Sequence, residues 1–469
     1  MSERQVVSAA PGLLEAFSQE FDGLFSRRNQ REGFRQYVAG LLLPAERNKT
    51  LTGLANTEPV IGAQEGRAQS LQWYVSESSW DEVAVNGRRV ALLMNTPSLA
   101  PREDGALVID ETGDRKAGHK TAHVGRQYLA NVGKLDNGVV SVSSLWADEQ
   151  VYYPIDFEPY TPSRWFEGGK ADGAFRTKLK IAQELVAQAL SRGIPFRAVV
   201  ADSFYGEDRT FRKGLESLGV GYVLALKPSH SWWHREGTIG SLEEAARASA
   251  WAGPKQAGAW LSVQRTFRDG HIEPWWALEV VAGPFGPQRL LRGVVVTTDP
   301  STLPELNTWY LITNLPAPAS QRAANSPLFV ASLAEIVRLY GLRTWVEQSY
   351  KQVKHTLGWA EYQVRSDLAI RRHWTLVWCA FTFCWWQASQ ANTIHDVLFV
   401  PDPATQPITI PISSQSPPQK KRRIKPASQP VLASRPASSQ GLARTLHHAQ
   451  ALLAGVLAAS PTAAFSTPP

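Results

Sequence analysis

Three acidic residues, far apart in the chain, have the types and settings that metal-dependent phosphoryl transfer requires. Asp110 ends the apolar run 105–110 (GALVID), and Asp202 lies at the end of a second run, 196–203 (FRAVVADS). Glu347 follows much later, in a segment of helical period. Two-metal chemistry needs carboxylates that converge from separate elements on two divalent cations about 3.5–4 Å apart. Mg²⁺ is the expected ion, because it prefers few carboxylates, retained waters and phosphate oxygens.

The surroundings of Glu347 show a spacing rule. Tyr340, Arg343, Glu347 and Lys354 follow one another at steps of three, four and seven residues. In a helix, which we predict over 333–350 and beyond, such steps return to nearly the same face. One face would then present a phenol, a guanidinium, a carboxylate and an ammonium, which suits a metal ligand flanked by phosphate-binding groups.

The acidic residues lie in a pattern typical of a mixed α/β sheet. Short apolar runs that end on an acid predict buried strands, and the segments between them have helical period. Strands 138–146 and 151–160 are expected to pair as a hairpin. They are followed by a helix over 175–192, a strand over 196–203, a helix over 209–218 and a strand over 221–228.

Composition divides the rest of the chain. We predict a helical domain over 1–100, a candidate DNA-binding domain, followed by a first part of the α/β core over 101–229 and a β-rich insertion over 230–320. A second part of the core over 321–398 and a disordered, basic Pro/Ser/Ala-rich tail over 399–469 follow. The basic stretch from Arg27 to Lys49 favours either a solvated helix face or a DNA-contacting surface, and the pattern leaves both open.

Net charge gives no independent evidence for DNA binding. The formal charge is +7, but residues 401–469 hold seven basic residues and one acidic residue, so the first 400 residues are nearly neutral. The two cysteines cannot form a disulfide framework. The longest apolar run, 376–386, is too short for a membrane span, and we expect a soluble protein of a reducing compartment with no membrane partner.

The motifs together resemble the DDE transposases of bacterial insertion sequences. The Tyr-Arg-Glu-Lys spacing resembles a signature of their insertion-sequence-four-like branch. The sequences around the first acid (VIDETGDRKAGHKTAHVGRQYLANVGK, 108–134) and the second (VVADSFYG, 199–206), with LQWYVSESSWD at 71–81, resemble the family numbered seven hundred and one. The resemblance covers residues 20 to 390 approximately.

The resemblance implies an RNase-H-like α/β catalytic core that is interrupted by the β-rich insertion between the second Asp and the Glu. It implies that Asp110, Asp202 and Glu347 are catalytic and bind two Mg²⁺ ions, for which Mn²⁺ is expected to substitute. The implied partners are double-stranded DNA, as transposon ends and as target, and a second copy of the chain in a homodimer on that DNA. The implied location is the bacterial cytoplasm, in association with the nucleoid. The expected DNA contacts are Tyr340, Arg343, Lys354, Lys351 and Arg126.

Several residues invite other interpretations. Glu111 is expected to point away from the site, because adjacent strand residues face opposite sides. His119 and His123 have the spacing of zinc ligands but no matching Cys or His pair. Trp232 or Trp233 could stack a flipped base, although core packing is the ordinary role of such residues. The alternative functions are a nuclease that does not join ends and a captured transposase acting as a DNA-binding regulator.

Overall fold

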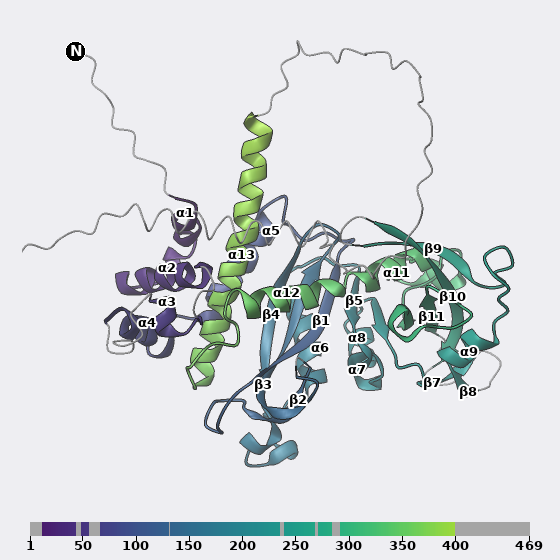
Figure 1. Ribbon diagram of the computed structural model, residues 1–469, viewed down its shortest axis with the longest axis horizontal. Helices are drawn as coiled ribbons and strands as arrows, with labels where there is room; N and C mark the ends of the chain where they lie inside the picture. The colour runs from purple at the N-terminus through teal and green to yellow at the C-terminus, as the bar shows by residue number, and fades with distance from the viewer. Residues whose placement is uncertain are drawn as a thin grey trace, which may run out of the picture.

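The computed structural model describes residues 12–43, 48–55, 66–130, 132–234, 239–267, 271–283 and 291–398. The predicted tail over 399–469 lies outside these ranges. Figure 1 shows a helical part beside a central sheet, which continues into a β-rich part on its other side. The helices are α1 (Leu13–Gln19), α2 (Arg28–Leu42), α3 (Leu51–Leu54), α4 (Gly66–Ser76), α5 (Glu82–Asn95), α6 (Lys178–Ser191), α7 (Ser203–Gly206), α8 (Arg209–Ser217), α9 (Leu242–Ala248), α10 (Gln321–Asn325), α11 (Leu333–Gly341), α12 (Thr344–His355) and α13 (Asp367–Leu398).

All the described strands belong to one twelve-stranded sheet. They are β1 (Ala106–Arg115), β2 (Gly125–Leu129), β3 (Lys134–Ala147), β4 (Tyr152–Tyr160), β5 (Ala198–Ala201), β6 (Tyr222–Ala225), β7 (Ser231–His234), β8 (Ile239–Ser241), β9 (Leu261–Thr266), β10 (Ile272–Gly283), β11 (Leu291–Thr297) and β12 (Thr308–Thr313). Short 3₁₀ turns occur at Asp22–Leu24, Ser163–Trp165, Gly169–Ala171 and Glu305–Asn307.

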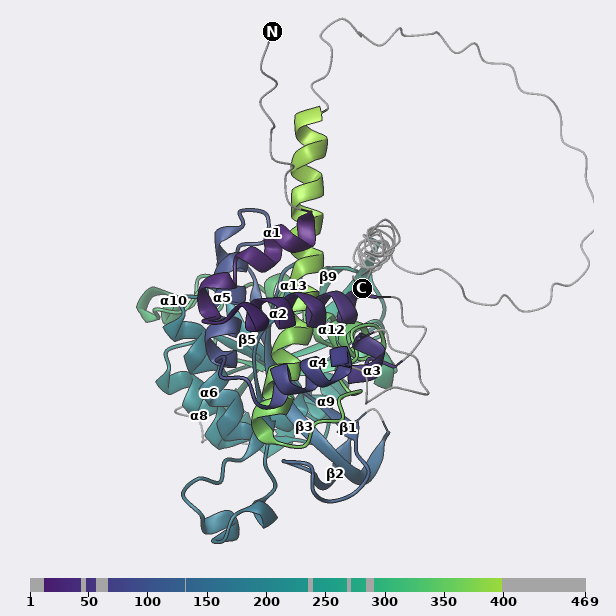
Figure 2. The ribbon, with the colours of Figure 1, turned by 90° about the vertical axis from the view of Figure 1, so that its left-hand side faces the viewer.

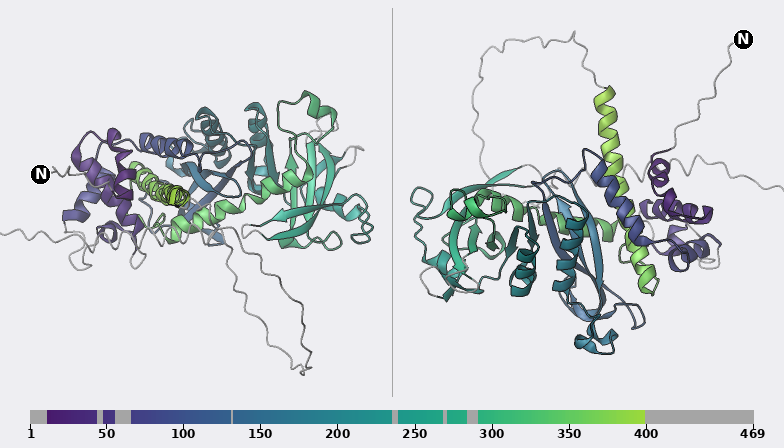
Figure 3. Two further views of the ribbon diagram at one scale, coloured as in Figure 1. Left: turned by 90° about the horizontal axis from the view of Figure 1, so that it is seen from above. Right: turned by 180° about the vertical axis from the view of Figure 1, so that it is seen from behind.

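The centre of the sheet has the arrangement expected of an RNase-H-like core. Strand β3 pairs antiparallel with β1 and β4, whereas β1, β5 and β6 run parallel to one another. The parallel strands read as continuous apolar runs because both faces are covered: all four residues of β5 are buried. Helix α6 lies behind β3 and β4, and α12 crosses the opposite face (Figure 3). The predicted fold class and the β3–β4 hairpin are confirmed.

The β-rich insertion extends the catalytic sheet. Strand β12 pairs antiparallel with β6, and β11, β10, β7 and β8 follow in that order. Its tryptophans largely fill the interior. Trp232, Trp260 and Trp275 are each at most 2% exposed, and the guanidinium of Arg212 lies 4.9 Å from the centre of the Trp232 ring. Trp232 therefore packs in the core, while the side chain of Trp233 lies outside the described part of the chain.

Helix α13 joins the N-terminal helices, although it comes from the far end of the described chain (Figure 2). It was predicted within the second part of the catalytic core, and it contacts α2, α4 and α5. Arg89 of α5 is fully buried and donates hydrogen bonds to the carbonyl oxygens of Pro154 and Ile155 and to Thr382. The helical part and the core thus share one interior, with α13 as the common element. None of the described helices is both long and apolar enough to cross a membrane.

The basic stretch of the N-terminal helices is partly paired within the protein. Arg35 forms ion pairs with Glu15 and Asp22 at 2.7 Å, and Lys49 is buried against carbonyl oxygens of α2 and the residue after it. Arg27 and Arg28 remain exposed. The charge pattern in this stretch therefore reflects internal packing as well as solvated surface.

A buried histidine links α13 to α2 and makes stability depend on pH. The ring of His373 is fully buried, with Nδ1 2.8 Å from the Tyr37 hydroxyl and Nε2 3.0 Å from the Gly358 carbonyl oxygen. Burial lowers the pKa of His373 from 6.5 to about 4. Between these values the unfolded chain binds a proton that the folded protein does not, so stability is lost as the pH falls from 6.5 towards 4.

We expect this histidine to lower the free energy of unfolding by about 2 kcal/mol when the pH falls from 7 to 5. Urea unfolding of the wild type and His373→Gln at the two pH values measures the effect, and the variant should lose about 2 kcal/mol less than the wild type. Equal pH dependence in the two proteins would contradict the expectation.

Candidate active site

Strand register places the first two acids side by side. Val108 of β1 pairs with Val200 of β5, and Asp110 and Asp202 each lie two residues beyond that pair. Asp110 continues along β1, opposite Ser143 of β3. Asp202 instead ends its strand and caps α7, because its carboxylate accepts a hydrogen bond of 3.0 Å from the Phe204 amide. Asp110, within β1, and Asp202, just after the carboxyl end of β5, thus lie at one level of the sheet.

The third acid reaches the site on helix α12, which differs from the prediction. The helix expected over 333–350 is interrupted: α11 ends at Gly341, and α12 begins at Thr344. Between them, the amides of Arg343 and Trp345 bond to carbonyl oxygens three residues back, as in a 3₁₀ turn. The prediction of one continuous helix is therefore wrong at Leu342 and Arg343.

The Arg343 guanidinium lies among all three carboxylates. One of its terminal nitrogens is 3.0 Å from Asp110 Oδ2 and 4.0 Å from Asp202 Oδ2, and the other is 3.3 Å from Glu347 Oε1. Residues predicted from three separate contexts therefore meet around one positive charge. Tyr340, one turn before Arg343, packs against Trp309 with a ring-centre distance of 5.0 Å.

Burial dominates the electrostatics of the site. Asp110 is only 8% exposed, and loss of solvation raises the pKa of its carboxyl to about 7, although Arg343 acts in the opposite direction. Burial alone would lower the pKa of Arg343, but Asp110 and the other negative partners raise it above its usual range. Burial also raises the pKa of the Tyr340 phenol to about 12. The single guanidinium of Arg343 therefore does not fully offset the cost of burying the Asp110 carboxylate.

The donor set suits a hard divalent cation. All three side chains offer carboxylate oxygens, the ligands that Mg²⁺ and Mn²⁺ prefer, and no thiol or imidazole accompanies them. Across the described ranges, no group of three or more His, Cys, Asp or Glu side chains is placed to hold an ion between them. Arg343 takes that central position, so the carboxylates fit metal ions only if the guanidinium moves aside.

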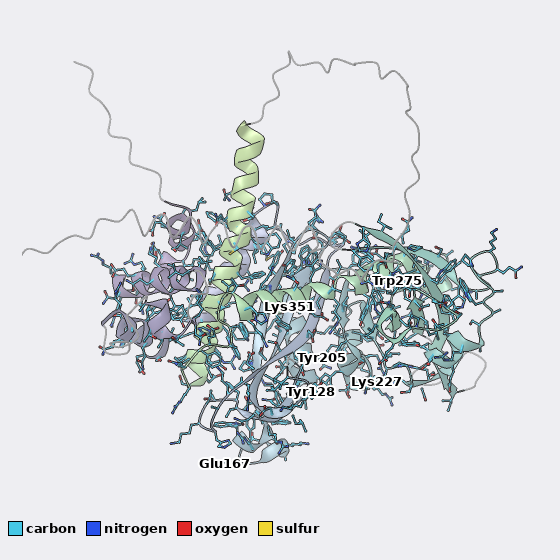
Figure 4. The ribbon with its side chains drawn as sticks, viewed as in Figure 1. Tyr128, Glu167, Tyr205, Lys227, Trp275 and Lys351 are labelled. Carbon is cyan, nitrogen blue, oxygen red and sulfur yellow. The ribbon has the colours of Figure 1, made fainter. Side chains whose placement is uncertain are left out.

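The other predicted site residues have different settings. Lys354 is 2.7 Å from the buried Asp114 carboxylate and donates a hydrogen bond of 2.9 Å to the Gly113 carbonyl oxygen. Lys351 is exposed on α12, one turn after Glu347, and is labelled in Figure 4. Arg126 is exposed on β2, away from the acids along the sheet. Only Lys351 therefore presents a free ammonium beside the third acid.

The residues that invited other interpretations are engaged elsewhere. Glu111 faces away from Asp110 and pairs with Lys178 at 2.7 Å. His123 lies between Thr161 and Asp367, at 2.8 and 2.7 Å, with a positive φ of 64°. The expected direction of Glu111 is confirmed, and His123 has a structural role in joining β-strand loops to α13.

Two neighbours of the acids had not been predicted. The Tyr350 hydroxyl is 2.6 Å from Ser143 Oγ, which ties α12 to the strand opposite Asp110. Phe204, two residues after Asp202, is 49% exposed, and its ring centre lies 5.7 Å from the Lys178 ammonium. Tyr350 follows Glu347 by three residues on a helix, and this spacing could have indicated that its side chain lies near the site.

A close backbone contact fixes the turn that carries Asp202. A methyl group at Gly206 would overlap the carbonyl oxygen of Ala225 on β6. We expect Gly206→Ala to lower the free energy of unfolding by about 1–3 kcal/mol and to displace α7, because the backbone must shift to relieve the overlap. Urea unfolding and DNA cleavage measure both effects. Gly173→Ala is the matched control, since nothing lies within 4 Å of its added methyl group, and equal stability of the two variants would contradict the argument.

Comparisons with known proteins identify the family of the chain. Residues 20–269 match a family described as "DDE superfamily endonuclease", and residues 175–383 match one described as "Transposase DDE domain". The chain is also similar to a probable transposase for insertion sequence element IS701 from Microchaete diplosiphon. The two are 31% identical over 359 residues, which cover 76% of this chain and 83% of that protein. The chain therefore belongs to the DDE transposase family.

Proposed function

We propose that the protein cleaves DNA at the terminal inverted repeats of an insertion sequence and transfers the 3′ ends to target DNA. The observation that carries this proposal is the convergence of Asp110, Asp202 and Glu347 on one cation-binding position. In cleavage, water attacks a phosphorus atom and the 3′ oxygen leaves. In transfer, that 3′ hydroxyl attacks a target phosphate and displaces a target 3′ oxygen. The same site can serve both steps, because both are phosphoryl transfers.

The three carboxylates would hold two Mg²⁺ ions, and Mn²⁺ is expected to substitute. When bound, these ions lower the pKa of the attacking hydroxyl and stabilise charge on the leaving oxygen. Arg343 would bind a DNA phosphate beside the acids, because its planar guanidinium suits two phosphate oxygens. The exposed Lys351 adds a second positive charge on the same side of α12.

The remaining predicted contacts have separate roles. Tyr340, packed on Trp309, shapes the wall beside Arg343 and offers its hydroxyl to the DNA backbone. Lys354 holds α12 on β1 through Asp114 and would reach DNA only by leaving that pair. A homodimer on paired DNA ends, acting in the bacterial cytoplasm, completes the proposal.

Joined DNA products test the proposal. The substrate is a duplex that carries the inverted repeats flanking the gene, incubated with supercoiled plasmid and Mg²⁺. Covalent joining of the 3′ ends to plasmid supports a transposase. Cleavage without joining would instead identify a nuclease, and specific binding without cleavage would identify a regulator; either result would overturn the proposal.

A further inference from the structure

The end of the sheet beyond the acids forms a two-stranded ribbon, made of β2 and the paired part of β3, residues 134–138. Its register pairs Arg126 with Asn137 and Tyr128 with Leu135. Side chains on directly paired residues of antiparallel strands point to the same face, so Arg126, Tyr128 and Leu135 lie together. We refer to these three side chains as the ribbon face.

The ribbon face is on the same side of the sheet as the catalytic acids. Asp110 pairs with Ser143, and the register of β3 continues without a shift from Ser143 through Gly138 into the ribbon. Residues 143, 141, 139, 137 and 135 therefore share one face. Helix α12 covers this face near Asp110 and Asp114, whereas Lys134 and Glu111 point to the other side. The open ribbon face thus continues the surface on which the acids lie.

The exposure and charge of the ribbon face suit a nucleic-acid backbone. Tyr128 is 53% exposed and Leu135 is 58% exposed. Arg126 is exposed, and it has no ion-pair partner within the described portion of the chain. The nearest acids along the same face of β1 are otherwise engaged, because Asp114 is buried against Lys354. Figure 4 shows Tyr128 on the ribbon and Lys351 on α12 in one view.

The distance between ribbon and acids corresponds to a short length of duplex. Six residues of β3 separate Ser143 from Asn137, which at about 3.4 Å per residue span roughly 20 Å, and Leu135 lies roughly 7 Å further. For a duplex that runs along β3, this separation corresponds to about six to eight base pairs, because B-DNA rises about 3.4 Å per base pair.

We infer that the ribbon face binds the DNA duplex that occupies the active site of the same protomer, six to eight base pairs from the cut. Arg126 pairs with a phosphate, and Tyr128 and Leu135 pack on the sugar edges of a groove, which a two-stranded ribbon can enter. This inference rests on the proposed function for the position of the duplex. It assigns the ribbon a role in holding the DNA in register with the acids.

The test compares the two faces of one ribbon. The double variant Arg126→Ala, Tyr128→Ala removes two of the three side chains of the ribbon face, and Lys134→Ala removes an exposed cation from the opposite face. The probe is a duplex carrying one flanking inverted repeat, with the cut site at its centre, bound in EDTA. Affinity, its salt dependence and ethylation interference at each phosphate are measured, and equal thermal unfolding of all the proteins confirms that they fold.

For the wild type we expect interference at phosphates about six to eight base pairs from the cut, in addition to contacts at the cut itself. The double variant should lose only the distant contacts, bind about 10- to 100-fold more weakly, and lower the slope of log affinity against log salt by about 1. Lys134→Ala should keep the distant contacts and bind within about twofold of the wild type.

Three results would overturn the inference. They are distant contacts that persist in the double variant, an equal loss in Lys134→Ala, and no binding of the duplex by the wild type. The inference would also fail if the double variant sedimented as a monomer, the wild type sedimented as a dimer, and both gave the same DNA footprint. That result would show that a second copy of the chain covers the ribbon face. Because binding is measured without metal, a ribbon footprint from a protein that joins no ends would refute the proposed function and leave this inference intact.

Discussion

Glu347→Gln should reduce Mg²⁺-dependent DNA cleavage about a thousandfold or more, while leaving affinity for the same DNA nearly unchanged. The amide has the shape of the carboxylate but no negative charge, so it holds a divalent cation poorly. Loss of several kcal/mol of transition-state stabilisation corresponds to a rate effect of about this size. The Glu347 side chain is 56% exposed, so its replacement should disturb the fold little.

Cleavage of an end-labelled duplex, together with binding measured in EDTA, separates the two effects. Glu305→Gln is the matched control, because Glu305 is an exposed acid in a turn of the insertion. Cleavage by Glu347→Gln at the rate of the control would exclude Glu347 from the active site, whatever its effect on DNA binding.

Arg343→Met should destabilise the metal-free protein by about 3 kcal/mol. Removing one partner of a buried ion pair leaves the other charge uncompensated, and Asp110 is buried beside the missing guanidinium. The expected cost is at the lower end of the usual range, because Asp202 and Glu347 are partly exposed to water. Millimolar Mg²⁺ should restore more stability to the variant than to the wild type, since the ion no longer competes with Arg343.

Urea unfolding in EDTA and in Mg²⁺ measures this directly. Lys351→Met is the control on the same helix: it removes an exposed cation and should change the free energy of unfolding by less than about 0.5 kcal/mol. An unchanged unfolding midpoint for Arg343→Met in EDTA would show that the guanidinium does not stabilise the three acids.

The sequence predicted the strands that carry the first two acids better than the contacts those acids make. Continuous apolar runs predicted β1 and β5, and the acids that follow these runs were recognisable because buried strands rarely carry charge. The spacing of Tyr340, Arg343 and Glu347 was informative even though the helix breaks between α11 and α12. A single 3₁₀ turn shifts the helix face only slightly, so the three residues still reach the same site.

The role of Lys354 could not be predicted from spacing along the helix. Strand β1 was expected over 105–110, but it runs to Arg115, and this places Asp114 in the sheet beneath α12. A local sequence pattern cannot show that a charged segment continues a strand when the helix that packs on that strand lies far away in the sequence. The face of the sheet on which Arg126 lies depends on how β2 pairs with β3, and a local sequence pattern does not show this pairing either.

A change of metal preference tests most directly whether the acids are metal ligands in catalysis. Asp202→Cys replaces a carboxylate with a thiolate, which Mg²⁺ accepts poorly and Mn²⁺ accepts more readily. We expect the variant to lose cleavage in Mg²⁺ and to recover part of it in Mn²⁺, whereas Asp202→Ala remains inactive in both. Cleavage by Asp202→Cys in Mg²⁺ at the wild-type rate would contradict the assignment of Asp202 as a metal ligand, and with it the proposed active site.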